Sequence, residues 1–283
     1  MKYKNFTGPN VALTGGFVGG TPIANFPPFQ PNSYRFNGSF SPTADDASVN
    51  AIWFRPDGTK VFYAGPSTDR IYQRTLSTPW DITSVGSSTS SGAITTNISG
   101  ISFDDINGDK VLVIDSVTNT ISKYTLSTAW DVTSLNTTAA QTNNSALVGR
   151  STPTGIWARS NGTLLLVANA GTSASLTTYN ASTGWDLSTL SLNTTTGLSG
   201  IVGANYMSNG NELMFVTNGT MINPKISAAY GLNWATTVDF TTLISPQVGS
   251  QITDIYFKND GSGFYITQSN GTSFSTIYQW IKR

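Results

Sequence analysis

A unit of about 50 residues recurs along this chain, and this repeat constrains the fold more than any other feature. Turn glycines recur at intervals of 50, 54, 48 and 51 residues, and tryptophans recur at intervals of 50, 55 and 49. Two independent markers that keep one period are not expected by chance, and a period in this range is typical of propellers and other repeat folds. The markers are Gly58, Gly108, Gly162, Gly210 and Gly261, and Trp80, Trp130, Trp185 and Trp234.

The order of residues within a unit predicts a small antiparallel sheet. An apolar run precedes a turn such as Asp57-Gly58, and a second apolar run follows it, as in a hairpin whose tight turn needs a positive φ. A third strand comes next, and the Trp80-Asp81 pair then leads into a fourth strand rich in Ser and Thr. Four short strands in each repeated unit are typical of a β-propeller.

Five such units predict an all-β fold, a five-bladed β-propeller of four-stranded blades. The fifth unit ends after its third strand, while a strand-like segment at 34–40 lies unassigned before the first unit. Since every blade must pack on its neighbours, we expect this segment to supply the missing strand and close the ring. The propeller would then cover 34–283, with units at about 48–97, 98–152, 153–197, 198–250 and 251–283 plus 34–40.

Residues 1–33 do not fit another unit. They hold three prolines in Phe26-Pro27-Pro28-Phe29-Gln30-Pro31 and two Gly-Gly pairs, which favour an extended arm. A poorly ordered terminus is one interpretation. The arm carries more apolar side chains than a solvated linker usually does, and an attachment arm is the other interpretation. Its candidate contact residues are Phe17, Ile23, Phe26 and Phe29.

The composition excludes several classes of function. The chain has no His and no Cys, which excludes a Ser-His-Asp or Cys-His triad, a His or thiolate zinc site and a disulfide framework. A net charge of zero without basic runs argues against nucleic-acid binding. No apolar segment approaches the length of a membrane span, and the N-terminus lacks the apolar stretch of a signal peptide. Nothing in the sequence indicates a cofactor.

Glycoside hydrolysis is the one enzymatic reaction that the composition leaves open. It needs two carboxyl groups beside the bond, one of them with a raised pKa. The single Glu, Glu212, falls in a predicted hairpin turn, and most of the Asp residues occupy predicted turns too. We therefore expect a protein that is not an enzyme.

The repeated Trp-Asp pairs and one acidic cluster are the next candidate sites. A tryptophan in each unit is expected to pack between blades, with a sugar-stacking platform as the alternative, and the following Asp is expected to cap a turn. The acidic cluster resembles the calcium loops of some propellers, although a solvated hairpin turn is the favoured interpretation. Its oxygen donors are Asp104, Asp105, Asn107 and Asp109.

A ring of small polar residues follows the second strand of each unit and could bind a glycan at one end of the propeller. Ordinary polar loop tips are the alternative interpretation. Besides Gly65, the candidates are Asp115, Asn169, Thr217 and Gln268.

The repeat itself resembles a known family. The first unit runs from Phe54-Arg55-Pro56-Asp57-Gly58-Thr59-Lys60 to Ile71-Tyr72-Gln73-Arg74-Thr75-Leu76-Ser77-Thr78-Pro79-Trp80-Asp81-Ile82. It is similar to the propeller repeats of bacteriophage structural proteins, especially those of marine phages, and of some bacterial surface proteins. The resemblance covers roughly 48–283, most closely in the first two units.

The resemblance implies a virion component, such as a tail-fibre, tail-adaptor or capsid-surface decoration protein. Its partners would be other capsid or tail proteins, bound through the arm, with the propeller facing outward for adsorption to host-surface glycans. It would be assembled in the host cytoplasm. The alternatives are a free glycan-binding propeller lectin and, more remotely, a glycoside hydrolase.

Overall fold

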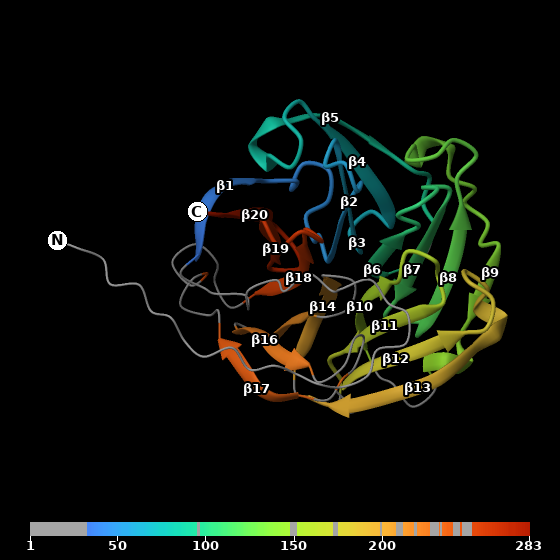
Figure 1. Cartoon of the computed structure of the whole chain (residues 1–283). Helices are drawn as coiled ribbons and strands as arrows, with labels where there is room; N and C mark the ends of the chain where they lie inside the picture. Colours follow the sequence, from blue (N-terminus) through green and yellow to red (C-terminus); the bar gives the residue numbers. More distant parts are fainter. Residues whose placement is uncertain are drawn as a thin grey trace.

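The chain folds into an all-β protein with a β-propeller arrangement, in which small antiparallel sheets stand around a common centre (Figure 1). The computed structural model describes residues 33–94, 97–147, 152–171, 175–198, 200–207, 212–217, 220–226, 232, 234–239, 244 and 251–283. The attachment candidates Phe17, Ile23, Phe26 and Phe29 lie outside the described residues.

Within the described residues the strands form five four-stranded sheets, and strands that follow one another in sequence pair side by side. The first sheet holds β2 (Ala51–Phe54), β3 (Lys60–Gly65), β4 (Arg70–Leu76) and β5 (Val85–Ser90), and the second holds β6 (Ile98–Phe103), β7 (Lys110–Asp115), β8 (Thr120–Thr125) and β9 (Gln141–Asn143). The third holds β10 (Pro153–Ala158), β11 (Leu164–Asn169), β12 (Ser175–Ala181) and β13 (Leu190–Gly197), and the fourth holds β14 (Ile201–Met207), β15 (Glu212–Thr217), β16 (Thr220–Ile226) and β17 (Trp234–Asp239). The fifth holds β18 (Ile252–Phe257), β19 (Gly263–Ser269), β20 (Ser275–Lys282) and β1 (Tyr34–Phe40).

The fifth sheet takes its fourth strand from the other end of the sequence. Strand β1 pairs antiparallel with β20, from Tyr34 opposite Lys282 to Phe40 opposite Ile277. The Tyr34 side chain is buried, its hydroxyl donates to the Gly261 carbonyl at 2.5 Å, and its ring meets Phe264 edge-on. This pairing confirms the prediction that the segment 34–40 completes the last unit.

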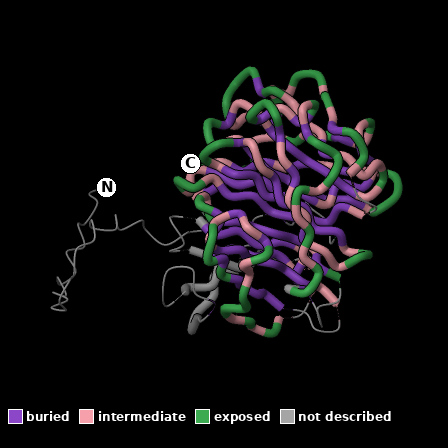
Figure 2. Tube along the Cα trace, turned by 90° about the vertical axis from the view of Figure 1, so that its right-hand side faces the viewer, coloured by how far each residue is buried: buried purple, intermediate pink, exposed green. Residues whose placement is uncertain are grey.

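The first strand of each sheet is the innermost one and contacts the first strands of the neighbouring sheets. The contacts run from β2 to β6, β10, β14 and β18, and β18 contacts β2 again. Buried stretches run through the middle of the molecule, and most exposed residues lie in the connecting loops (Figure 2). The core therefore lies within and between the sheets, where each sheet covers the apolar face of the next.

The turn between the first and second strands of a sheet holds the tryptophan of the same unit. Gly58, Gly108 and Gly162 have φ angles of +73°, +69° and +69°, as predicted for this turn, whereas Gly210 lies outside the described residues. Trp80 and Trp130 also have positive φ angles, +66° and +61°, which are uncommon for bulky residues. The Trp130 amide donates to the Gly108 carbonyl at 2.9 Å, which fixes the ring against the turn.

Replacement of Gly108 by alanine is expected to destabilise the fold by about 2–4 kcal/mol. The new Cβ would sit at a positive φ and only 2.2 Å from the Trp130 ring. Denaturant unfolding measures the effect, and Gly197→Ala is the matched control, since a Cβ there meets nothing within 4 Å. Equal losses in the two variants would contradict this account of the turn.

Hydrogen bonds that recur from unit to unit join neighbouring sheets. The side-chain oxygen of a glutamine in one unit accepts from a backbone N–H in the next unit, at 3.0 Å in each case. That N–H belongs to the residue two positions after the tryptophan. A side chain of the same preceding unit also donates to the carbonyl of that tryptophan. The accepting glutamines are Gln279, Gln73 and Gln141, and the donors to the carbonyls are Gln279, Lys60 and Lys123.

The Asp of each Trp-Asp pair caps a short helix, as predicted. Asp81, Asp131 and Asp186 accept from the backbone N–H two residues later and so begin the 3₁₀ helices η2 (Ile82–Ser84), η3 (Val132–Ser134) and η5 (Leu187–Thr189). A further 3₁₀ helix, η4 (Ser145–Leu147), follows β9. None of the helices in the described part of the chain is long and apolar enough to span a membrane.

Candidate functional site

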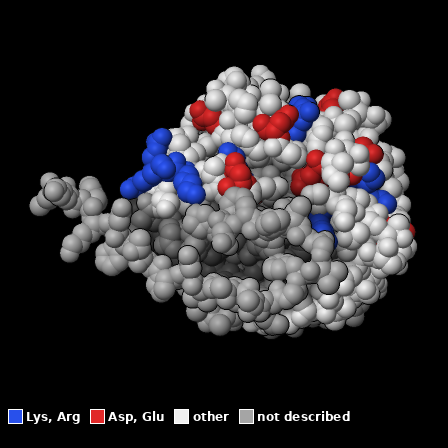
Figure 3. All heavy atoms as spheres, in the orientation of Figure 1, with Lys and Arg blue, Asp and Glu red and all other residues white. Residues whose placement is uncertain are grey.

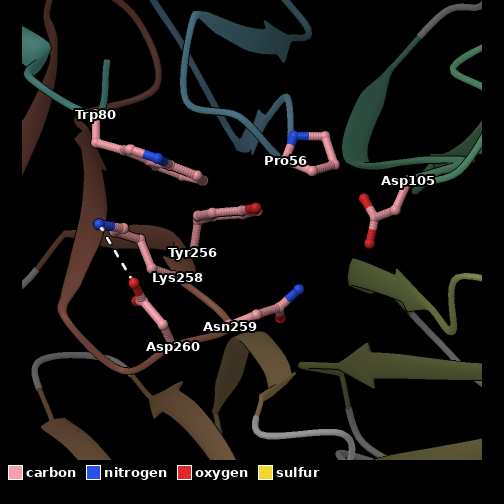
Figure 4. A pocket seen from close by; sticks show the side chains of 7 residues that line it. All are labelled: Pro56, Trp80, Asp105, Tyr256, Lys258, Asn259 and Asp260. Carbon is pink, nitrogen blue, oxygen red and sulfur yellow. Dashed lines mark ion pairs between the residues drawn. The ribbon is translucent and has the colours of Figure 1, made fainter. Parts of the chain in front are cut away.

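A cavity of about 170 Å³ lies where β2, β6 and β18 end, and we call it the first-strand pocket (Figure 4). Its walls come from three sheets, because the loop after each innermost strand reaches toward the centre of the molecule. Trp80, Asp105 and Asn259 point into it from three sides in Figure 4. The lining residues are Pro56, Trp80, Asp105, Tyr256, Lys258, Asn259 and Asp260.

Asp105 is the carboxyl group of this pocket whose pKa is raised. Burial raises the pKa of Asp105 to about 7, and the negative charge of Asp104 adds to the rise, while Ser160 and Trp53 oppose it. The Ser160 hydroxyl is 3.4 Å from Oδ2, whereas Oδ1 is buried without a hydrogen-bond partner. The indole N–H of Trp53 faces the same carboxyl group and lowers its pKa, although the contact lacks ideal hydrogen-bond geometry. Asp105 of the second sheet and Trp53 of the first thus interact with each other.

The opposite wall carries a positive charge beside an aromatic ring. The Lys258 ammonium lies 4.9 Å from the centroid of the Trp80 ring and 3.8 Å from Oδ2 of Asp260. Burial works against ionisation of Asp260, but hydrogen bonds from Ser262 and the charge of Lys258 lower its pKa overall. Asp105 and Asp260 therefore differ in pKa, and the pocket holds one ionised carboxylate and one carboxyl that titrates near neutrality.

Trp80 is more open than its counterparts in the next two units. Trp130 and Trp185 are 8% and 9% exposed and thus buried, whereas Trp80 is half-buried. Trp80 also lines a second hollow of about 410 Å³, which we call the Trp80 groove. Its other lining residues include Asn37, Pro79, Asp81, Lys258 and Gln279, from the first and last units.

Trp80 and Trp130 pack between sheets, as predicted. Trp80 stacks on Phe54 of its own sheet and on Tyr256 of the fifth, with ring centroids 5.6 and 6.4 Å apart. Trp130 contacts Phe103 of its own sheet and Phe62 of the first. The half-buried Trp80 also keeps part of its surface in the first-strand pocket.

A second perturbed carboxyl, Asp254, lies deeper, where β18 meets β2. Its Oδ2 accepts from the Ile52 backbone N–H at 3.0 Å, across the boundary between the last and first sheets. Burial raises the pKa of Asp254 to about 8, although the Ile52 and Ile255 N–H groups lower it. The strand registers put Gly203 of the neighbouring sheet at the same level as Asp254, and a Cβ on Gly203 would come 2.5 Å from the Asp254 carboxylate.

The predicted calcium candidates divide between two environments. Asp104 accepts from the Ile106 and Asn107 backbone N–H groups, and the Lys110 ammonium bridges it to Asp109 at 3.2 and 2.5 Å. Asp105 lines the first-strand pocket instead. No group of three or more residues able to hold a metal ion occurs in the described residues. The geometry favours a hairpin turn that is satisfied by its own lysine.

The expected ring of polar loop tips is wrong in one respect, since its members belong to strands. Asp115, Asn169 and Thr217 end β7, β11 and β15, and Gln268 is the penultimate residue of β19. They occupy equivalent places, but Asp115, Asn169 and Gln268 are buried, because the second strand is flanked on both sides. Asp115 accepts from Val117 and Thr118 at 2.8 Å, and Gln268 accepts from the Tyr278 hydroxyl at 3.0 Å.

The first-strand pocket could hardly be predicted from the sequence. Pro56, Asp105 and Asn259 are equivalent loop residues of three units, but they differ in type and so escape a search for repeats. Glu212, the other carboxylate considered, begins β15 in the fourth sheet. A signal existed at Asp254, since an Asp stands where the first strands of the other units have glycine or alanine.

Comparison with known proteins supports the fold alone. No protein-family model and no curated protein matches this sequence. Among solved structures, hydrazine synthase from Kuenenia stuttgartiensis is similar with a TM-score of 0.50 and 14% identity, over 83% of this chain and 63% of that one.

Two further structures are more distant. The Myceliophteria thermophila Cps50 (Swd1) β-propeller domain has a TM-score of 0.45 and 11% identity, over 82% of this chain and 65% of that one. A putative 6-phosphogluconolactonase from Bacteroides uniformis has a TM-score of 0.44 and 16% identity, over 68% of this chain and 53% of that one. The chain spans less than two thirds of the length of each of the three structures.

Proposed function

We propose that this chain is a closed five-bladed propeller that serves as a non-catalytic structural component of a bacteriophage virion. It would be a tail-fibre, tail-adaptor or capsid-surface decoration protein. Residues 1–33 attach it to other virion proteins, and the propeller faces outward and adsorbs to the host surface.

Five blades are supported by the contacts between innermost strands. Each of β2, β6, β10, β14 and β18 belongs to a different four-stranded sheet, and each contacts the next in a cycle that returns to β2. The pairing of β1 with β20 joins the two ends of the chain within one sheet. A ring held in this way needs no second copy to bury its inner faces.

The observation that carries the structural role is what the repeated residues do. The turn glycine and the Asp of the Trp-Asp pair order their own unit, and the glutamines bind the segment after the tryptophan of the next unit. The resemblance of this repeat to those of phage structural proteins therefore concerns residues that build a ring, not residues that perform a reaction. On the face shown in Figure 3, most of the described surface is uncharged, and charges of both signs lie in small groups.

The place where residues 1–32 join the fold supports an attachment role for them. The next residue, Ser33, accepts a hydrogen bond from the Arg283 amide at 2.7 Å, and Tyr34 is buried in the fifth sheet. A pulling force on the arm would thus act on β1, and the pairing of β1 with β20 would resist it.

Deletion of residues 1–32 is expected to abolish incorporation into purified virions while leaving the propeller folded. The deletion removes no described strand, and the melting temperature is expected to change by no more than a few degrees. Quantitative mass spectrometry of virions measures the incorporation. A truncated protein that joins the particle at full occupancy would contradict the attachment role.

The non-catalytic part of the proposal is tested at the first-strand pocket, because Asp105 and Asp260 have the different pKa values that a glycosidase requires. We expect no release of reducing sugar from bacterial polysaccharides. Activity that disappears in Asp105→Asn would make the remote alternative, a glycoside hydrolase, the function.

The same pocket favours the free glycan-binding lectin as the second candidate function. Absence of the protein from purified virions would support this candidate.

A further inference from the structure

The first-strand pocket is the strongest candidate for a ligand site, because polar side chains of two sheets meet in one cavity. Asp105 comes from the loop after β6, and Lys258 and Asn259 come from the loop after β18. Trp80 lies half-buried against the same cavity. Groups that converge on one cavity from different sheets can bind a single ligand together.

The polar groups around the pocket call for a ligand that both donates and accepts hydrogen bonds. Oδ2 of Asp105 has a long contact with the Ser160 hydroxyl, at 3.4 Å, and can also accept from a ligand. The Lys258 ammonium lies 3.8 Å from Asp260 and can donate to a ligand. The Asn259 amide is exposed and makes no hydrogen bond within the described residues, so it offers one of each. Hydroxyl groups meet all three requirements.

Charge and size narrow the class of ligand further. One ammonium group, Lys258, and two carboxyl groups, Asp105 and Asp260, line the pocket, so neither a strong cation nor a strong anion finds a surface of uniform opposite charge. A volume of 170 Å³ accommodates one six-membered ring with its hydroxyl groups, but not a chain of such rings. Small-molecule sites of this kind combine an apolar wall with a few convergent polar groups, and Trp80, Tyr256 and Pro56 provide that wall.

The neighbouring Trp80 groove gives room for a second unit. It shares Trp80 and Lys258 with the first-strand pocket and measures about 410 Å³. Trp80 therefore lines both hollows. A ligand that fills both would pass across Trp80, which is half-buried.

We propose that the first-strand pocket binds the terminal sugar of a neutral glycan, and that the Trp80 groove receives the adjoining sugar. Asp105 accepts from a sugar hydroxyl, Lys258 donates to another, and Asn259 does both. This inference rests on the proposed adsorption role for its biological meaning, but binding is measured on the isolated full chain. It places glycan recognition at the opposite ends of the strands from Asp115, Asn169 and Gln268.

The test uses the full-length protein with an array of neutral and acidic glycans, followed by saturation-transfer NMR with free glucose, galactose, mannose and N-acetylglucosamine. A single sugar is expected to bind with a dissociation constant on the order of 1 mM, and a neutral oligosaccharide more tightly. Asn259→Ala and Asp105→Ala are expected to weaken the binding at least tenfold. Asn144 is another exposed asparagine whose side chain makes no hydrogen bond to the part of the chain that the structure describes. Asn144→Ala is therefore the matched control and should bind as the unaltered protein does.

Three outcomes would overturn the proposal: no neutral glycan bound, acidic glycans bound exclusively, or binding that survives both pocket variants. Because Asn259 is exposed, its variant keeps the test valid even if Asp105→Ala proves unstable. Failure here leaves incorporation into virions unaffected, and failure of incorporation leaves the sugar measurements unaffected. The two proposals can therefore fail separately.

Discussion

Deletion of residues 33–40 is expected to lower the melting temperature of the propeller by about 10 °C or more. The deletion removes β1, exposes the outer edge of β20 and uncovers Trp280 and Phe264, which Tyr34 and Phe36 contact. Loss of one buried aromatic side chain and of a paired strand amounts to about 5 kcal/mol or more. For a domain of this size each kcal/mol shifts the melting temperature by about 2–4 °C. Differential scanning calorimetry measures the shift.

Two comparisons separate closure from a general effect of truncation. The 1–32 deletion keeps β1 and should melt near the full-length chain. Tyr34→Ala should reproduce a large part of the loss, since it removes the hydroxyl contact to Gly261 and the packing on Phe264. Arg35→Ala changes an exposed neighbour and should leave the melting temperature nearly unchanged. A 33–40 deletion that melts like the full chain would show that the ring does not depend on this strand.

Replacement of Asp254 by asparagine is expected to flatten the pH dependence of stability between about pH 4 and pH 8. In the unfolded chain an Asp titrates near pH 4, whereas burial raises the pKa of Asp254 to about 8 in the fold, so the native state holds the proton longer. Stability is therefore lost as the pH rises through this window and levels off above it. The loss is on the order of 5 kcal/mol at most, because each pKa unit corresponds to about 1.4 kcal/mol.

Urea unfolding at a series of pH values measures this effect as the difference between the two proteins. Asparagine can still accept from the Ile52 N–H, so the variant should match the original chain near pH 4 and exceed it at pH 8. Asp57→Asn is the contrasting control. Burial works to raise the pKa of Asp57, but hydrogen bonds from Thr59 lower it overall. The ionised Asp57 therefore stabilises the fold above about pH 4, and Asp57→Asn should lose stability mainly in that range. Parallel pH profiles for the original chain and Asp254→Asn would refute the account of the buried carboxyl.

The repeat made much of the architecture predictable, since its markers depend on local geometry. Gly58 and Gly108 were expected at tight turns because such turns need a positive φ, and Asp81 was expected to cap because its carboxylate reaches the N–H two residues on. The positive φ of Trp80 and Trp130 was not expected, because their conformation depends on the turn against which each ring packs.

The candidate site was less predictable, because it combines positions that differ from unit to unit. Asp105 belongs to an acidic cluster in the sequence, but its neighbours Trp53 and Ser160 come from other sheets. Both lower its pKa through contact in space. Polar residues at the ends of the second strands were mistaken for loop tips. Their burial follows from the strands on either side, which no local pattern reveals.

The sequence by itself determined the kind of unit, its period, its turns and the need for a strand from the N-terminal side, because these follow from short-range periodicity and turn chemistry. The tertiary structure alone decided which side chains meet. It joined β1 to β20, brought Trp80 against Tyr256 and Lys258, and buried Asp105 and Asp254 where innermost strands converge. The physical reason is that burial, contact and charge interaction depend on distance in space, and closing the ring brings together residues that lie far apart in the sequence.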